Sequence, residues 1–179
     1  RESSLYGMPA IAISLATYEH SDYTQTLEAS MTIIEACLSS LPTEPSNLGR
    51  PQGSQRTPSI QGSMHDRALS AFADGDLILN INGPEQWNGN FQTVALGSRW
   101  YHNAIDMRDV DNIGVAFEVG AAIIEDEDIP GTDCNAINSG AVSITPLSSW
   151  PANHPLGLSE ALLSVATEQS SLGLPKWLD

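Results

Sequence analysis

The sequence predicts an α/β fold, and three local patterns carry that prediction. The run Ala10–Leu15 is apolar apart from Ser14, which is typical of a strand buried on both faces of a parallel sheet. An amphipathic helical pattern follows at 22–41, so the two segments form a βα unit. A turn at Gly131 and a short helix at 134–137 then lead into a β-branched strand at 142–145, which ends at Pro146.

The helix expected at 22–41 has clear ends and one apolar face. Asp22 can cap its first turn, Gln25 stands three residues later as in a capping box, and Pro42 stops it. Because a helix of this kind buries its apolar stripe, we expect the stripe to pack on the sheet. The stripe consists of Leu27, Met31, Ile34, Leu38 and Leu41.

The segment 43–63 interrupts this regular pattern and is interpreted as a loop insertion. It is rich in Pro, Gly, Ser and Gln and holds almost no apolar residue. Arg50 and Arg56 lie within it and Arg67 just beyond it, so almost half of the seven bases gather here. Two readings stay open, a lid that attracts anions and a solvated surface loop.

The remaining elements follow in order along the chain. A helix is expected at Met64–Ala73 and a strand at 77–81. Weak alternation at 92–96 and 113–119 predicts a β-hairpin arm at 91–120. The acidic run at 125–128 is expected to be a solvated turn, a last helix is expected at 159–169, and Trp177 is expected to dock on an apolar surface.

Composition narrows the function classes. Twenty-two acids against seven bases give a formal charge of -15, which disfavours binding to nucleic-acid backbones. A phosphatase with this charge needs a cation or a local positive site to hold its substrate. No run approaches the roughly 18 apolar residues of a membrane span. Cys37 and Cys134 are far apart and are expected to be free thiols, and the four histidines show no metal-binding spacing.

Three segments together resemble one known family. They are GMPAIAIS at 7–14, LNINGP at 79–84 and GTDCNAINSGAVSITPL at 131–147, and they occur in the family's order. The chain resembles the C-terminal portion of the SurE family of metal-dependent 5'/3'-nucleotidases. Gly83 and Ala141 depart from the family pattern, which favours an aliphatic residue and a tyrosine at these places. The resemblance implies a Rossmann-type sheet with a β-hairpin arm and a C-terminal helix, in a single domain that is incomplete at its N-terminal end.

The resemblance also implies a metal site that this sequence does not contain. SurE-like proteins hold magnesium or manganese with an Asp pair in an NDDG turn and with a serine and an asparagine from nearby loops. No such turn precedes Gly7, so no catalytic residue and no metal ligand is assigned to this chain, and alone it is expected to be inactive. The acid pairs Asp109 with Asp111 and Asp126 with Asp128 are poor substitutes, because they fall in the expected arm and turn.

Other residues acquire expected roles from the same resemblance. Thr132 and Asp133 open a helix whose amides can attract a phosphate, with N-capping as the simpler reading. Arg99, Tyr101, His102 and His154 are candidates for an oligomer interface, because arm and C-terminal segment exchange between subunits in this family. The family's acidic partner of His154 is replaced here by Trp150.

The leading hypothesis is therefore a cytoplasmic phosphomonoesterase that hydrolyses nucleoside monophosphates with Mg or Mn. This chain would supply scaffold and interface to a homodimer or homotetramer, or would pair with a complementary N-terminal chain. The alternative is a non-catalytic oligomerisation or binding module on a SurE scaffold.

Overall fold

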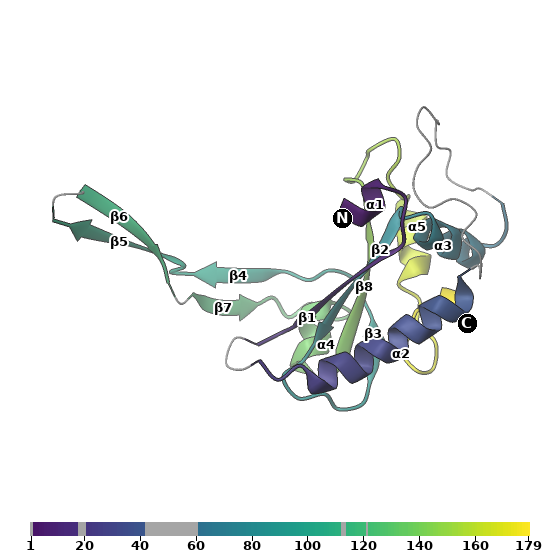
Figure 1. The fold of residues 1–179 in the computed structure, drawn as a ribbon, viewed down its shortest axis with the longest axis horizontal. Coiled ribbons are helices and arrows are strands. Elements are labelled where there is room, and N and C mark those ends of the chain that lie inside the picture. Colours follow the sequence, from purple (N-terminus) through teal and green to yellow (C-terminus); the bar gives the residue numbers. More distant parts are fainter. Residues whose placement is uncertain (1, 18–20, 42–60, 112–113, 121) are drawn as a thin grey trace.

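A mixed four-stranded sheet forms the centre of the computed structural model, which describes residues 2–17, 21–41, 61–111, 114–120 and 122–179. The spatial order of its strands is β1-β2-β8-β3 (Figure 1). β1 (Ala10–Leu15) is parallel to β2 (Leu77–Gly83), and β3 (Phe91–Thr93) is parallel to β8 (Val142–Ser148). β2 and β8 are antiparallel. The predicted α/β class is confirmed.

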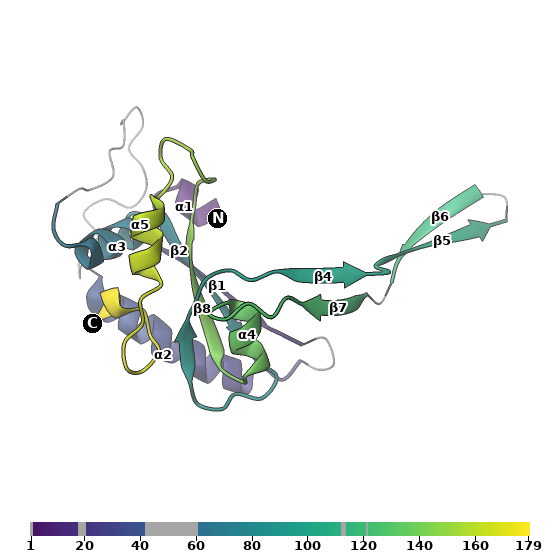
Figure 2. The same ribbon diagram turned by 180° about the vertical axis from the view of Figure 1, so that it is seen from behind.

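The two faces of this sheet differ because side chains alternate along each strand. On one face, Leu77, Leu79 and Ile81 of β2 are fully buried in the main core. Four elements contribute residues to that core: α2 (Thr24–Ser40), α3 (Met64–Ala73), α5 (Glu160–Ala166) and the 3-10 turn η1 (Lys176–Leu178). The opposite face carries Asn80 and Asn82, and the short helix α4 (Asp133–Asn138) packs there against β8 and β2 (Figure 2).

The C-terminal residues complete the core. Trp177 is almost fully buried, its ring centroid lies 5.5 Å from that of Phe72, and its Nε1 donates to the Ala166 carbonyl at 3.1 Å. The expectation that Trp177 docks on an apolar surface is confirmed. The helix expected at 159–169 is shorter and begins at Glu160, with the Ser159 hydroxyl accepting from the Leu162 amide. A single helical turn, α1 (Glu2–Leu5), precedes β1.

The orientation of α2 contradicts the sequence prediction. Its buried residues are Thr26, Ala29, Ser30, Ile33 and Cys37, whereas the side chains of Leu27 and Leu38 are 60% and 65% exposed. The reason is a close approach between helix and sheet: a Cβ atom built on Gly83 would overlap the Thr26 side chain. Small side chains permit that approach, so Leu27, Met31 and Leu38 of the predicted stripe face outward, whereas Leu41 packs against the core. Gly83, a departure from the family pattern, is what lets α2 lie this close.

The arm consists of two antiparallel ladders placed end to end. β4 (Arg99–His102) pairs with β7 (Ile123–Asp126), and β5 (Ile105–Val110) pairs with β6 (Gly114–Val119). Together they extend well away from the sheet (Figure 1). We call these four strands, residues 99–126, the arm.

Two boundaries around the arm differ from the sequence prediction of 91–120. Phe91–Thr93 joins the central sheet as β3, because its backbone finds a ladder partner in β8. The acidic run expected as a turn instead begins in β7, where Asp126 lies opposite Arg99. Most of the predicted insertion at 43–63 lies outside the described residues. No helix within the described ranges has the length and apolar character needed to cross a membrane.

Candidate functional site

A hollow of about 520 Å³ lies where the parallel strands β1 and β2 end. Ligands of open α/β sheets bind at the carboxyl ends of strands, and a volume of this size suits a small molecule. The hollow is bounded by the ends of β1 and β2, the segment before the arm, the first arm strand and α4. Its lining residues are Ser14, Leu15, Ala16, Thr17, Asn80, Asn82, Leu96, Gly97, Arg99, Tyr101, Asp133, Cys134 and Ile137.

The floor of the hollow is polar. Asn80 and Asn82 are two residues apart on β2, so both side chains emerge on the face opposite the core. Ser14 is the register partner of Asn82 on β1, and its hydroxyl donates to the Asn82 Oδ1 at 2.5 Å. No hydrogen bond to the Asn80 side chain or to the Asn82 amide nitrogen is formed within the described residues, so both amides present groups to the hollow.

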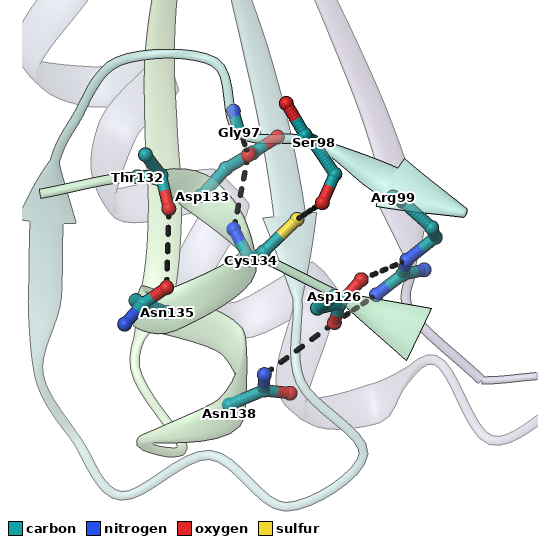
Figure 3. Close-up of polar contacts among 9 residues, drawn as sticks. All are labelled: Gly97, Ser98, Arg99, Asp126, Thr132, Asp133, Cys134, Asn135 and Asn138. Atoms are coloured by element: carbon teal, nitrogen blue, oxygen red, sulfur yellow. Dashed lines mark hydrogen bonds and ion pairs between the residues drawn. The ribbon is translucent and has the colours of Figure 1, made fainter. Parts of the chain in front are cut away.

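One wall of the hollow is fixed by Asp133 at the start of α4 (Figure 3). Its Oδ1 accepts from the Gly97 amide at 2.7 Å and from the Cys134 amide at 2.9 Å. A larger residue at position 97 would be too close to this carboxylate, because a Cβ atom added to Gly97 would stand 2.9 Å from Asp133 Oδ1. The carboxylate therefore ties the segment before the arm to the helix.

The root of the arm is closed by a two-point ion pair (Figure 3). Arg99 Nε lies 2.6 Å from Asp126 Oδ1, and Nη2 lies 2.9 Å from Oδ2. Hydrogen bonding to Arg99 holds the pKa of Asp126 below its usual range, and the same contact raises the pKa of Arg99. Asn138 of α4 adds a longer contact of 3.4 Å to Asp126, so both arm strands are anchored near α4.

The thiol in this wall is protonated at neutral pH. Burial, followed by the negative charges of Asp133 and Asp126, raises the pKa of Cys134 to about 11. Burial likewise raises the pKa of Cys37, which is in the main core, to about 12. A thiol acts as a nucleophile in its ionised form, so neither cysteine is suited to covalent catalysis.

The sequence is similar to curated proteins named 5'-nucleotidase SurE. A curated protein of Heliobacterium modesticaldum named 5'-nucleotidase SurE is 28% identical over 159 residues, which cover 87% of this chain and 47% of the relative. A protein of the same name from Pelotomaculum thermopropionicum is 29% identical over 150 residues, covering 82% and 44%. A third, from Desulforamulus reducens, is 40% identical over 74 residues, covering 40% and 29%.

The chain is SurE-like. It spans about half the length of the curated relatives it matches. No protein-family model matches it. Among solved structures, the SurE protein from Aquifex aeolicus is 22% identical with a TM-score of 0.44, over 87% of this chain and 48% of that one.

The SurE-like chain uses Thr132 and Asp133 to hold its own backbone. The Thr132 hydroxyl donates to the Ile129 carbonyl at 2.8 Å, and the Asp133 amide donates to the Ala95 carbonyl at 3.0 Å. With the Cys134 amide bound to Asp133, the first two amides of α4 already have partners. Phosphate proximity of Thr132 and Asp133 stays a prediction, and the contacts favour their capping role.

The four residues predicted at an oligomer interface separate into two places. Arg99, Tyr101 and His102 all lie on β4, where His102 Nε2 is 2.9 Å from Glu125 Oε2 of β7. His154 follows the last residue of β8, which pairs with the beginning of β2, so this residue lies at the opposite end of the strands from the hollow. Its ring stacks on Trp150 with centroids 4.5 Å apart, and its Nδ1 accepts from the Leu156 amide.

The acids that the structure describes in the SurE-like chain do not form a site for a divalent cation. No group of three or more His, Cys, Asp or Glu side chains that could hold a metal occurs in the described part of the chain. Asp126 is engaged by Arg99, and Asp128 accepts from the Asn135 side chain at 2.7 Å.

Sequence reasoning missed the polar floor of the hollow. Asn80 and Asn82 belong to the motif LNINGP, which predicts a strand, and Ser14 ends the segment GMPAIAIS. The pattern that could have revealed them is the alternation LNIN, which gives β2 one apolar and one amide-bearing face. It becomes a site only when β1 is known to be the parallel neighbour of β2.

Proposed function

We propose that this chain is part of a metal-dependent phosphomonoesterase, a 5'/3'-nucleotidase that hydrolyses nucleoside monophosphates. The observation that supports it is similarity over 82–87% of the chain to proteins named 5'-nucleotidase SurE. The hollow at the carboxyl ends of β1 and β2 stands where an α/β enzyme places its substrate. The contribution of this chain is substrate-binding scaffold and association surface.

The metal belongs, in this proposal, to a part of the protein other than the described residues. Mg or Mn would supply charge neutralisation and an activated water to phosphate hydrolysis. The acids nearest the hollow are held by an arginine and by backbone amides, which supports the proposal that the described residues alone do not form the catalytic centre. Its buried, unpaired thiols suit a reducing compartment, and we place the protein in the cytoplasm.

The proposed activity is tested by phosphate release. The whole reading frame that contains this chain is expressed, and release from AMP and 3'-AMP is measured with and without Mn²⁺. The expected result is release that Mn²⁺ stimulates and EDTA abolishes. The 179-residue chain, assayed in parallel, is expected to release no more phosphate than a blank. Metal-stimulated turnover by the short chain would overturn the assignment of the metal elsewhere.

Self-association is the second part of the proposal, and the arm supports it. Ile105 faces Val119 and Met107 faces Phe117 across the β5–β6 ladder, so these four apolar side chains share one face. Met107 and Phe117 are 70% and 67% exposed. Pairing of this apolar face with the same face of a second copy would remove these side chains from water, which gives a homodimer or homotetramer. Arg99, Tyr101 and His102 lie at the root of this surface.

A complementary N-terminal chain is a further proposed partner. β1 is an edge strand of the sheet with an apolar sequence, and beside it α2 exposes Leu27 and Leu38. An added strand and helix would cover both. The alternative function, a non-catalytic oligomerisation or binding module, is favoured by the same exposed surfaces. An absence of phosphate release from the whole reading frame, with association retained, would select it.

A further inference from the structure

The electrostatics of the hollow favour an uncharged ligand. Arg99 is the one base among the described residues that line it, and the charge of Arg99 is balanced by the two-point contact with Asp126. Asp133 brings a further negative charge to the wall. A phosphate entering this space would meet no unbalanced positive charge, and the chain as a whole carries -15.

The floor offers paired hydrogen-bonding groups of both kinds. Asn80 has an amide oxygen and an amide nitrogen without partners in the described residues, and Asn82 has its nitrogen. The Ser14 hydroxyl holds the Asn82 oxygen and so fixes which side of that amide faces outward. Asparagine amides recognise the edge of a nucleobase because a base edge also places a donor beside an acceptor.

The remaining walls suit a flat ring. Tyr101 is 54% exposed on β4 and Leu96 is 61% exposed before it, and both line the hollow. Ile137 of α4 adds a half-buried apolar side chain. Bases stack on aromatic side chains with little dependence on sequence, and an aliphatic wall excludes water from the ring.

We propose that this hollow binds the nucleoside end of the substrate and that Asn80, Asn82 and Tyr101 determine base specificity. The inference rests on the proposed nucleotidase function for its ligand class. It goes beyond that function by placing the base in this chain and the phosphate outside the hollow. The base lies against Tyr101, and its polar edge meets the two amides of β2.

Binding to the 179-residue chain tests the inference without any catalysis. Adenosine, AMP and ribose 5-phosphate are titrated separately into the labelled chain, without added metal, and backbone amide shifts are followed. Adenosine and AMP are expected to bind with dissociation constants within about threefold of each other, and ribose 5-phosphate at least tenfold more weakly. Shifts should centre on the end of β2, β4 and the start of α4.

Four variants locate the site. Tyr101→Ala and Asn80→Ala are each expected to weaken adenosine binding by about tenfold, as for loss of one stacking or bidentate contact. Tyr101→Phe keeps the ring and should bind as the original chain does. Trp100→Ala is the matched control, because Trp100 is a neighbouring exposed aromatic of β4 that does not line the hollow. It should leave the dissociation constant unchanged.

Two outcomes overturn the inference. One is a folded chain that does not bind adenosine, or binds ribose 5-phosphate as well as AMP. The other is equal weakening by Trp100→Ala and Tyr101→Ala. Failure of the proposed function looks different: the whole reading frame releases no phosphate from AMP, while the chain still binds adenosine at this hollow.

Discussion

At the scale of single residues, the ionisation of Asp126 controls the root of the arm. Its carboxylate is mostly buried and receives two hydrogen bonds from Arg99. Charge-assisted hydrogen bonds are about twice as strong as neutral ones, and each contributes roughly 1.5–3 kcal/mol. The two residues are 27 positions apart in the sequence and lie on β4 and β7, so their ion pair fixes the direction in which the arm extends from the central sheet.

Acid is expected to weaken this contact. The folded-state pKa of Asp126 lies below the unfolded value of about 3.9, so its stabilising contribution is complete above that value and is lost as pH falls through the folded pKa. Asp126→Asn should lower the free energy of unfolding at pH 7 by about 1–3 kcal/mol and flatten its fall between about pH 4 and pH 2. Urea unfolding at each pH measures this.

The exposed arm carboxylate Asp106 provides the control for that measurement. Asp106→Asn should leave both the stability at pH 7 and its pH profile nearly as they were, because surface substitutions change stability by about 0.5 kcal/mol or less. An Asp126→Asn profile that falls as steeply as the original would show that the pair contributes little.

Gly83 is the second residue with a specific expectation. Gly83→Ala forces a methyl group into the Thr26 side chain, and overpacking of this kind costs about 1–3 kcal/mol. Adding Thr26→Ala removes most of the overlap and should restore part of the lost stability. Thermal unfolding of both single variants and the double variant gives the coupling. Simple additivity of the two effects would contradict the close approach of α2 to the sheet.

At the scale of elements, the arm is expected to drive association. Met107→Glu with Phe117→Glu places two like charges on the apolar face of the β5–β6 ladder and should convert a dimer or tetramer into monomer. Light scattering after gel filtration, over a range of concentrations, measures the mass. Arg108→Gln, on the opposite face of β5, is the control and should keep the assembly. A monomeric mass for the unsubstituted chain would contradict the prediction that the arm drives association.

Elements also show why some predictions succeeded. β1, α3 and β8 are specified by their own sequences: a mainly apolar run, a Ser63 capping box, and a β-branched stretch bounded by a turn. The prediction that β1 is buried on both faces is wrong, because β1 lies at the edge of the described sheet and is partly exposed. The existence of these three elements needed no knowledge of distant residues. The bounds of the arm did need it, because Phe91–Thr93 becomes a strand of the sheet only by pairing with β8, about 50 residues later.

The face of α2 was predicted wrongly for a related reason. Hydrophobic periodicity identifies an apolar stripe, and the prediction assumed that the stripe meets the sheet. The contact is instead made by Ala29, Ser30 and Ile33, because Gly83 brings the strand close. The candidate site shows the same limit: the hollow joins Ser14, Asn82 and Asp133, which only the fold brings together.

At the scale of the whole molecule, body and arm tip are expected to be separable. β5 and β6 pair with each other and extend away from the sheet (Figure 1). Replacing residues 104–120 by a two-residue Asn-Gly turn should leave the melting temperature of the body within a few degrees, since no core residue is removed. A differential scanning experiment tests this. Collapse of the body would mean that the tip contributes to its stability.

β4 connects the hollow to the tip of the arm, because two of its four residues line the hollow and the strand leads on into the β5–β6 ladder. Arg99 and Tyr101 line the hollow, and β5 of the apolar ladder begins after two intervening residues. A partner that binds the β5–β6 ladder and rotates β4 therefore moves the Tyr101 ring and the Arg99 guanidinium, which line the hollow. Thermodynamic linkage makes the effect mutual: if assembly tightens ligand binding by some factor, the ligand tightens assembly by that same factor. The arm then couples assembly to ligand binding by rotating about the Arg99–Asp126 ion pair.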